Sequence, residues 1–308
     1  MLYLTDQTGP TRAFIPATAR ATGDTLTAAD QSVALYLGCN SPLTWYDDNN
    51  HEDAARVVII DQANGSQFDA IVDALKSGQP WPDTVFALAL TGRGFRGQRN
   101  RPWTALRGNL HFTASFKLRA PVRDIEAGLV ALPAVAVMRA IEQGTGMKVQ
   151  PRVKWVNDVM IEHRKVAGVL TSTQVQGDAV TSAVFGIGLN IEQRPSLPAQ
   201  PSSPEPGALA QADPRSAGKL AYWFRLLTMH LRDGVRELLE SGSAPLVQAY
   251  RERTCFLGQP VRIWPEDPEA GEASPLACGI VRALNADLSL SLDNNATPIR
   301  HGRMELPA

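Results

Sequence analysis

Residues 152–170 read RVKWVNDVMIEHRKVAGVL, a strand–turn–strand pattern in which two lysines flank a pair of short polar residues. The chain has only six lysines against twenty-four arginines, so the pair Lys154 and Lys165 within this stretch is notable. A lysine ammonium can stabilise charge that builds on a phosphate oxygen. A nearby carboxylate such as Asp158 can hold a magnesium ion or a hydroxyl group. Spacing alone, however, favours a surface hairpin that turns at Asn157 and Asp158.

A second stretch, residues 91–110, reads TGRGFRGQRNRPWTALRGNL. It holds five arginines and four glycines with no acidic residue, so its charges repel one another and its backbone is loose. Such a segment suits a loop that is mobile when empty and is ordered by an anion, because glycine lets backbone amides approach phosphate or carboxylate oxygens. A solvated basic loop is an equally good interpretation of this stretch taken alone. No G-x-x-x-x-G-K-[ST] sequence occurs, which excludes a P-loop.

A third stretch, residues 185–190, reads FGIGLN. Two glycines that alternate inside a buried strand weaken it, and they usually mark the close approach of a ligand or of another backbone. A planar ring could lie over them, and Asn190 could pair with an amide-like edge. The G-x-G pattern by itself is weak support for a site.

Around these motifs, apolar runs and alternating patterns predict a mixed sheet. The predicted strands cover residues 57–60, 84–90, 110–118, 153–155, 166–171 and 183–191. Helical periods predict helices over 125–143, 220–238 and 246–253, and one more that Ser66 caps. Gly144 is the predicted cap of the helix over 125–143. The predicted fold class is α+β, a mixed sheet with helices mainly on one face.

Two further segments differ from this core in their residue composition and pattern. Residues 193–214 contain six prolines among small polar residues, which predicts a loop. After Gly258, short strands separated by turn residues predict a small β-barrel of about fifty residues.

The composition excludes several classes of protein. A length of 308 residues suits about two domains, and a net charge of −1 excludes a basic coat for nucleic acid. The sequence predicts neither a membrane span nor a secretory signal. Cys39, Cys255 and Cys278 lie far apart, which favours a reducing, cytoplasmic setting. His111 and His163 have no second His or Cys at ligand spacing, so they are predicted to be structural or solvated.

The first fifty residues carry two arginines and five aspartates, a net charge of −3. A DNA-reading helix needs cations to meet phosphate, so we reject DNA binding by this segment. We expect an N-terminal extension over residues 1–56, which packs on the core or is partly disordered. A catalytic domain over 57–254 and a small domain over 255–308 complete the predicted division.

Together the three motif stretches resemble the biotin protein ligase family. GRGFRG with Trp103, then GNL, KWVND, RKVAGVL and GIGLN follow the family's order and approximate spacing. FLGQPVRIW and GIVRALNADLSLSLDNN continue the resemblance to the C-terminus, so that it covers roughly residues 57–308. The resemblance implies a class II synthetase-like biotin/lipoate ligase catalytic domain followed by an SH3-like β-barrel.

The resemblance also implies a two-step reaction. Biotin and Mg-ATP give biotinyl-5′-AMP and pyrophosphate, and a lysine of the biotin-acceptor domain of a biotin-dependent carboxylase then takes the biotinyl group. ATP and Mg²⁺ are therefore the expected cofactors and biotin the substrate. The resemblance suits a monomer or homodimer with no nucleic-acid or membrane partner.

Two residues receive catalytic roles from the resemblance. Arg93 and its glycine-rich loop would fold over the adenylate, and Lys154 would contact the biotin carboxylate and the α-phosphate. Asn157 and Asp158 would hold the turn and its phosphate or Mg²⁺ contacts, and Lys165 would help bind the triphosphate.

The resemblance implies further residues that bind biotin or the nucleotide. They are Ser66, Gly92, Gly94, Arg96, Trp103, Asn109, Gly168, Gly186, Gly188 and Asn190. Ser66 would bond the ureido group of biotin, and Gly168 would border the biotin ring. Trp103 would line the adenine side of the ligand pocket, and Asn190 would lie at the edge of the base. The two glycines of GIGLN would leave room beneath the ligand.

Several positions differ from the family pattern, mostly on the biotin side. Ser66-Gln67-Phe68 stands where Ser-Thr-Asn is usual, Ala89 where glutamine is usual, and Val156 where proline is usual. A buried ureido group loses about 1–3 kcal/mol for each missing hydrogen bond. Two alternatives therefore stay open: a ligase for another carboxylic acid such as lipoate or octanoate, and a diverged, non-catalytic binding module of the same fold.

Overall fold

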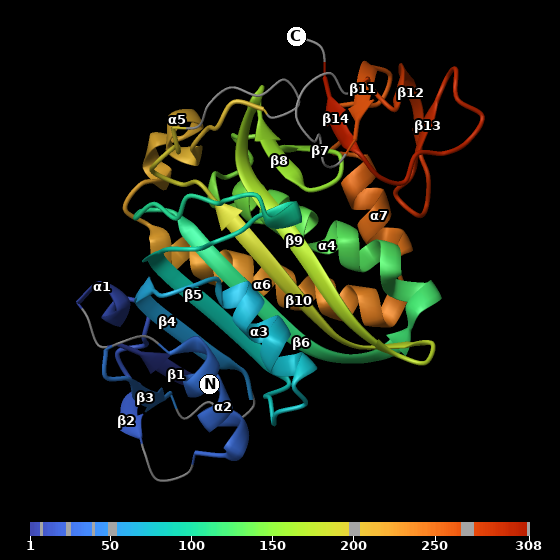
Figure 1. Ribbon diagram of the computed structural model, residues 1–308. Helices are drawn as coiled ribbons and strands as arrows, with labels where there is room; N and C mark the ends of the chain where they lie inside the picture. Colours follow the sequence, from blue (N-terminus) through green and yellow to red (C-terminus); the bar gives the residue numbers. More distant parts are fainter. Residues whose placement is uncertain are drawn as a thin grey trace.

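The computed structural model describes residues 1–6, 9–22, 26–38, 41–48, 54–196, 204–265 and 274–306. Its largest element is a ten-stranded sheet in the order β2-β3-β1-β4-β5-β6-β10-β9-β8-β7 (Figure 1). Its strands are β1 (Leu2–Thr5), β2 (Arg20–Thr22), β3 (Thr44–Asp47), β4 (Arg56–Ala63), β5 (Thr84–Gly92), β6 (Leu110–Pro121), β7 (Arg152–Lys154), β8 (Asp158–Ile161), β9 (Arg164–Gln176) and β10 (Ala179–Leu189). Strand β4 runs parallel to both β1 and β5, whereas the other pairs are antiparallel, which confirms the predicted mixed sheet.

Helices cover both faces of this sheet. The helices are α1 (Gly9–Arg12), α2 (Ala28–Leu37), α3 (Gln67–Lys76), α4 (Val122–Gly144), α5 (Leu209–Ala212), α6 (Leu220–Ser241) and α7 (Ala244–Arg251). The long helices α4 and α6 pack with α7 on one face, as predicted, and α2 and α3 cover part of the other (Figure 1). None of the helices in the described ranges is both long and apolar enough to cross a membrane.

Strand β5 connects the two layers because it is buried on both sides. Phe86 and Leu88 join the core beneath α4 and α6, whereas Val85 and Ala87 join the core beneath α3. A strand buried on both faces needs apolar residues at every position, and the run TVFALAL supplies them. This strand therefore has the burial that the sequence predicted.

The helix boundaries follow the predicted caps with one exception. Ser66 caps α3, and its hydroxyl accepts a hydrogen bond of 3.2 Å from the Asp69 amide. Helix α4 instead runs through Gly144 and is capped by Thr145, so the predicted glycine cap is wrong. The reason lies in packing: a Cβ at residue 144 would overlap the Trp223 ring of α6, so glycine lets the two helices approach.

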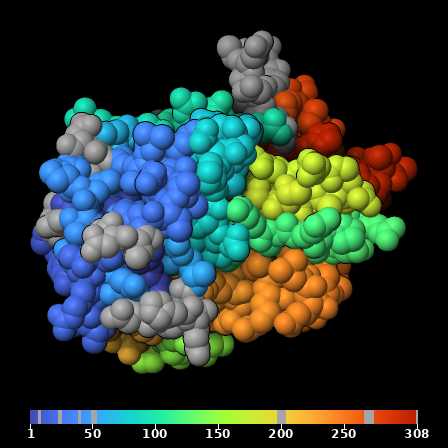
Figure 2. Space-filling view, turned by 90° about the horizontal axis from the view of Figure 1, so that it is seen from below, coloured from blue at the N-terminus to red at the C-terminus, as the bar shows by residue number. Residues whose placement is uncertain are grey.

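The N-terminal residues extend the main sheet. Strand β1 pairs with β4 in register from Leu2 opposite Arg56, and β3 and β2 continue the sheet outward. The buried Asp30 of α2 accepts a hydrogen bond of 2.6 Å from Arg56 Nε, which ties α2 to the start of β4. Seen from below, these residues, drawn in blue, adjoin the light-blue and cyan segments that follow them (Figure 2). The boundary at residue 56 stays a prediction.

The C-terminal residues form a separate four-stranded antiparallel sheet in the order β13-β12-β11-β14. Its strands are β11 (Pro260–Trp264), β12 (Ala277–Leu284), β13 (Leu290–Leu292) and β14 (Arg303–Glu305). The indole Nε1 of Trp155, beside the KWVND turn, donates to the Leu288 carbonyl at 2.8 Å, so this sheet is anchored next to β7. The SH3-like barrel stays a prediction.

Candidate functional site

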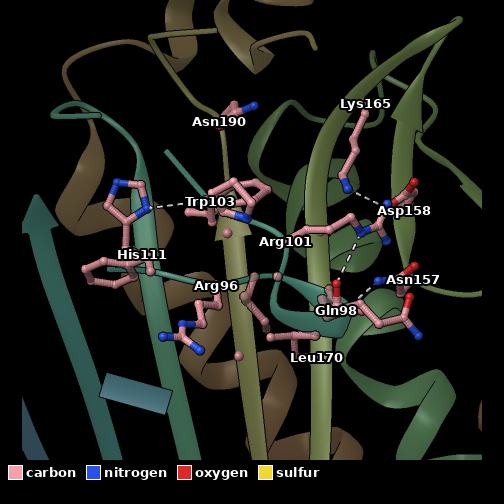
Figure 3. A pocket seen from close by; sticks show the side chains of 18 of the residues that line it. Arg96, Gln98, Arg101, Trp103, His111, Asn157, Asp158, Lys165, Leu170 and Asn190 are labelled. Atoms are coloured by element: carbon pink, nitrogen blue, oxygen red, sulfur yellow. Dashed lines mark hydrogen bonds and ion pairs between the residues drawn. The ribbon is translucent and has the colours of Figure 1, made fainter. Parts of the chain in front are cut away.

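A cavity of about 430 Å³ opens on the α3 face of the sheet, where the three motif stretches meet (Figure 3). The first turn of α3, the β5–β6 loop, the KWVND turn, and strands β6, β9 and β10 all contribute to its lining. Ten of the predicted residues line it: Ser66, Arg96, Trp103, Asn157, Asp158, Lys165, Gly168, Gly186, Gly188 and Asn190. Stretches that are far apart in the sequence therefore converge on one cavity.

Five predicted residues lie outside the lining: Arg93, Lys154, Gly92, Gly94 and Asn109. The Arg93 side chain is exposed at the end of β5. Lys154 is 5% exposed at the end of β7, where it is paired in register with Asp158. The predicted catalytic roles of Arg93 and Lys154 stay predictions.

Glycines form the floor of the cavity, and the rings of this chain lie over them. A Cβ at Gly188 would overlap the Trp103 indole, and a Cβ at Gly186 would lie 2.9 Å from the Phe68 ring. Gly168 faces both Lys165 and Trp103. Trp103 and Phe68 therefore occupy the space directly above the two glycines of GIGLN, and the predicted room beneath a ligand stays a prediction.

The arginine-rich segment is a hairpin folded back on itself. Arg96 and Pro102 form an antiparallel bridge, and the Gly97 amide donates to the Arg101 carbonyl at 2.7 Å. The Trp103 amide donates to the Phe95 carbonyl at 2.9 Å, which closes the hairpin at its base. Arg96 and Arg101 line the cavity, so they are the loop cations placed to meet a bound anion.

Cations gather around Asp158 at one end of the cavity. Lys165 Nζ lies 2.5 Å from its carboxylate, and the Arg101 side chain extends toward it (Figure 3). Burial raises the pKa of Asp158, but Lys165 and Lys154 lower it by more, so the carboxylate stays charged. Burial lowers the pKa of Lys154, while Asp158 acts in the opposite direction. One carboxylate thus faces several cations, which leaves a positive end that suits a polyanion.

The turn that carries Asp158 is fixed to its neighbour strand. Asn157 accepts a hydrogen bond of 3.0 Å from the Val169 amide through its carbonyl, and its side-chain amide donates to the Val169 carbonyl at 3.2 Å. Strands β7 and β8 do form a hairpin, and its turn lines the cavity. The hairpin is therefore confirmed, although its turn covers residues 155–157 and Asp158 already begins β8, and the site interpretation of KWVND stays a prediction.

Two asparagines hold the chain that leaves β10. Asn109 Oδ1 accepts from the amides of Ile191, Glu192 and Gln193 at 3.0–3.1 Å. Its Nδ2 donates to Asn190 Oδ1 at 3.3 Å, and Asn190 Nδ2 donates to a carbonyl, that of Gly207, at 3.1 Å. Both side-chain amides are thus engaged within the protein. The structure gives Asn109 a role in holding the backbone rather than contact with the cavity.

Sequence reasoning missed several lining residues. Phe68 and Arg101 line the cavity, as do Pro195, Pro204, Glu205 and Pro206 of the proline-rich segment. Its Gly207 amide donates to the Lys165 carbonyl at 2.8 Å, and the Lys165 amide donates to the Glu205 carbonyl at 2.8 Å. Proline content predicts a loop but not where it returns, so the sequence carried no signal for this contact.

Among the residues that the structure describes, the side chains around the cavity do not form a resident Mg²⁺ site. Mg²⁺ takes oxygen ligands, usually one or two carboxylates together with substrate phosphates. No group of three or more His, Cys, Asp or Glu side chains that could hold a metal occurs in the described ranges. Of the carboxylates in the lining, Asp158 faces Lys165 and Glu205 accepts from Arg194 at 3.0 Å. Both are already neutralised by cations.

Comparison with known proteins agrees with this geometry. The sequence model of the Biotin/lipoate A/B protein ligase family matches residues 73–190. The matched segment is similar to the domain of this family. It contains the hairpin, the KWVND turn and the glycine floor.

Relatives with curated names cover parts of the chain. The bifunctional ligase/repressor BirA of Bacillus subtilis is 33% identical over 116 residues, which is 37% of this chain and 35% of BirA. The biotin–[acetyl-CoA-carboxylase] ligase of Paracoccus denitrificans is 27% identical over 61% of this chain and 78% of its own length. The match thus spans about a third of the B. subtilis relative.

Solved structures extend the likeness to most of the fold. The biotin protein ligase from Aquifex aeolicus, in complex with biotin and ATP, has a TM-score of 0.61 with 18% identity. The match covers 82% of this chain and 98% of that one. At this identity the likeness concerns the fold, and it agrees with the predicted biotin/lipoate ligase architecture.

Proposed function

We propose that this chain is an ATP-dependent biotin–protein ligase. The observation that carries the proposal is the shape of the cavity, with an apolar, glycine-floored part at Phe68 and Leu170 and a cationic end at Lys165 and Arg101. An acid with an apolar chain fits the first part. A nucleotide phosphate fits the second, so the acyl–phosphate bond would form between them.

The first step joins the two substrates at that boundary. A biotin carboxylate oxygen attacks the α-phosphorus of ATP, biotinyl-5′-AMP forms and pyrophosphate leaves. Lys154 and Lys165 stabilise the negative charge that grows on the α-phosphate, and this role needs no covalent bond to the enzyme. Lys154 acts from behind Asp158, because it is buried and outside the lining.

The second step consumes the adenylate. The ε-amine of an acceptor lysine attacks the biotinyl carbonyl carbon, an amide forms and AMP leaves. We propose a biotin-acceptor domain of a biotin-dependent carboxylase as the partner. The ligase would act as a monomer or homodimer.

Among the loop cations, we assign contact with bound ATP to Arg101 and Arg96. Both line the cavity, whereas Arg93 is exposed outside it. The predicted role of Arg93 requires the hairpin to close further once the adenylate has formed. We place Mg²⁺ on the phosphates of ATP rather than at a protein site, because Asp158 already faces Lys165.

We place the reaction in the cytoplasm. ATP is available there, and the free thiols of Cys255 and Cys278 suit a reducing compartment.

Biotin-dependent exchange between ATP and labelled pyrophosphate tests the first step. We expect exchange with biotin, and we expect labelled biotin to be transferred to an acceptor domain in the complete reaction. A protein that binds biotin and ATP in calorimetry but gives no exchange would be a non-catalytic module, and the proposal would fail.

A ligase for another acid is the second candidate, and one observation favours it. Gln67 is 4% exposed, and neither polar atom of its side chain has a hydrogen-bond partner among the described residues. Such a buried amide is costly, and Gln67 lies between Ser66 and Phe68, which both line the cavity. Exchange that is driven by lipoate or octanoate and not by biotin would reassign the substrate.

A further inference from the structure

His111 contacts the arginine-rich hairpin at three points. It lies on β6 beneath the hairpin and is 2% exposed. Its Nδ1 lies 3.2 Å from the indole Nε1 of Trp103 (Figure 3). Its Nε2 lies 3.0 Å from the Leu106 carbonyl oxygen. The ring of Phe95 meets the imidazole edge-on, with ring centres 5.7 Å apart. His111 therefore contacts both arms of the hairpin, through Phe95 and Trp103, and the segment that follows it, through Leu106.

These bonds define the protonation of the ring. An indole N–H only donates, so Nδ1 of His111 must accept and carries no proton. A carbonyl only accepts, so Nε2 must donate and carries the proton. His111 is thus the neutral tautomer protonated on Nε2. Burial, which lowers the pKa of His111 to about 4, agrees with a neutral ring at neutral pH.

The Trp103 indole is the link from His111 to the cavity. It lies over the Gly188 floor, and Lys165 Nζ is 5.9 Å from its ring centre. The indole can turn about its side-chain bonds, whereas β6 lies at the centre of the sheet and is hydrogen-bonded to strands on both sides. The hydrogen bond to His111 therefore fixes the orientation of the Trp103 side chain relative to the rigid strand β6.

We propose that His111 is a positioning residue: its two ring nitrogens hold Trp103 and Leu106, and so hold the arginine-rich hairpin over the ligand cavity. His111 itself belongs to the cavity lining, but both of its ring nitrogens are bonded to the loop, so we expect it to act on the ligand through Trp103. The neutral anchor leaves the cationic side chains of the hairpin, Arg96 and Arg101, directed to the cavity.

Three substitutions at this position separate the two hydrogen bonds. In His111→Asn, the amide oxygen takes the place of Nδ1 and still accepts from Trp103. In His111→Gln, the amide nitrogen takes the place of Nε2 and still donates to the Leu106 carbonyl. His111→Phe keeps a ring against Phe95 and loses both bonds. His163→Phe is the matched control, because His163 is exposed at a turn and lies outside the cavity lining.

The indole N–H resonance of Trp103 reports the anchor without any ligand. The chain has six tryptophans, so loss of one resonance in Trp103→Phe identifies it. We expect this N–H to exchange slowly with solvent in the unsubstituted protein, in His111→Asn and in His163→Phe. We expect it to shift and to exchange at least about tenfold faster in His111→Gln and His111→Phe, since one hydrogen bond corresponds to about that factor. An unchanged resonance in His111→Phe would overturn the proposal.

Kinetics report the consequence for the cavity, and this part rests on the proposed ligase activity. The KM for ATP should rise about tenfold in His111→Gln and His111→Phe with a smaller change in kcat, and His111→Asn should restore it to within about threefold. Equal KM values in Asn and Gln variants would assign His111 a merely structural role. A protein with no exchange activity would refute the ligase, while the indole resonance would still decide the role of His111.

Discussion

Acidification from pH 7 to pH 4 should weaken the fold in a way that depends on His111. Burial lowers the pKa of this imidazole from 6.5 to about 4, and only a backbone hydrogen bond opposes the change. In the unfolded chain the imidazole is in water and titrates near its ordinary value of 6.5. Between these two values the unfolded chain binds a proton that the folded chain does not bind. The free energy of unfolding therefore falls as the pH falls through this range.

The size of the effect follows from the two pKa values. They differ by roughly 2.5 units, and each unit corresponds to about 1.36 kcal/mol, so about 3 kcal/mol of stability is lost between pH 6.5 and pH 4. Domains are stable by about 5–15 kcal/mol in total. Protonation of this one side chain would thus remove a large part of the stability, and it would also break the bond that Nδ1 accepts from Trp103.

Urea unfolding at a series of pH values measures this loss. We expect the free energy of unfolding of the unsubstituted protein to fall, relative to that of His111→Asn, by about 3 kcal/mol as the pH falls from 7 to 4. The lowered pKa values of Asp30 and Asp158 lie below 3.8, so these carboxylates lose their contribution at lower pH. The pKa of His230 is also lowered by burial, but His230 is present in both proteins and cancels in the difference. Parallel stability curves for the two proteins would refute the reasoning.

Three other substitutions test the site itself. Lys154→Ala should lower biotin-dependent pyrophosphate exchange about a hundredfold or more, because it removes a buried cation behind Asp158 at the phosphate end of the cavity, while circular dichroism stays unchanged; near-normal exchange would contradict its role. Arg101→Ala should raise the KM for ATP about tenfold, whereas Arg93→Ala should leave it within about threefold, and equal effects would contradict our choice of loop cation. Gly188→Ala should lower the stability by about 1–3 kcal/mol in thermal unfolding, because the added methyl group overlaps the Trp103 ring; an unchanged melting temperature would contradict that contact.

Local patterns predicted the strands and helices around the cavity, and non-local pairing explains what they missed. The run TVFALAL is apolar at every position, so its burial on both faces could be predicted from the sequence. Strands β1, β2 and β3 have three or four residues each, too few for a clear period, and they gain stability from the sheet edge at β4. For β1, which pairs with β4 directly, that edge begins at Arg56, far along the sequence.

The glycine signal in the site was informative but incomplete. The alternation in FGIGLN predicted the close approach of a ligand or of another backbone, and the structure shows the approach of two side-chain rings instead. Trp103 and Phe68, which make that approach, come from a loop and from a helix start, and no period links either to β10. Sequence patterns identify positions where a strand has no side chain, whereas which residue packs against those positions depends on the whole fold.

The arginine-rich hairpin is ordered in the structure although its positive charges repel one another. Its three arginines, Arg96, Arg99 and Arg101, repel one another, and its glycine costs entropy to fix, so charge alone would leave it disordered. The contacts that hold its base are neutral: the Phe95 ring, the Trp103 indole and the Leu106 carbonyl all meet a neutral His111. Because these contacts need no anion, they can hold the hairpin in place while Arg96 and Arg101 line the cavity. A bound phosphate then has only to neutralise side chains that already line the cavity, so less of the binding free energy is lost to ordering the loop.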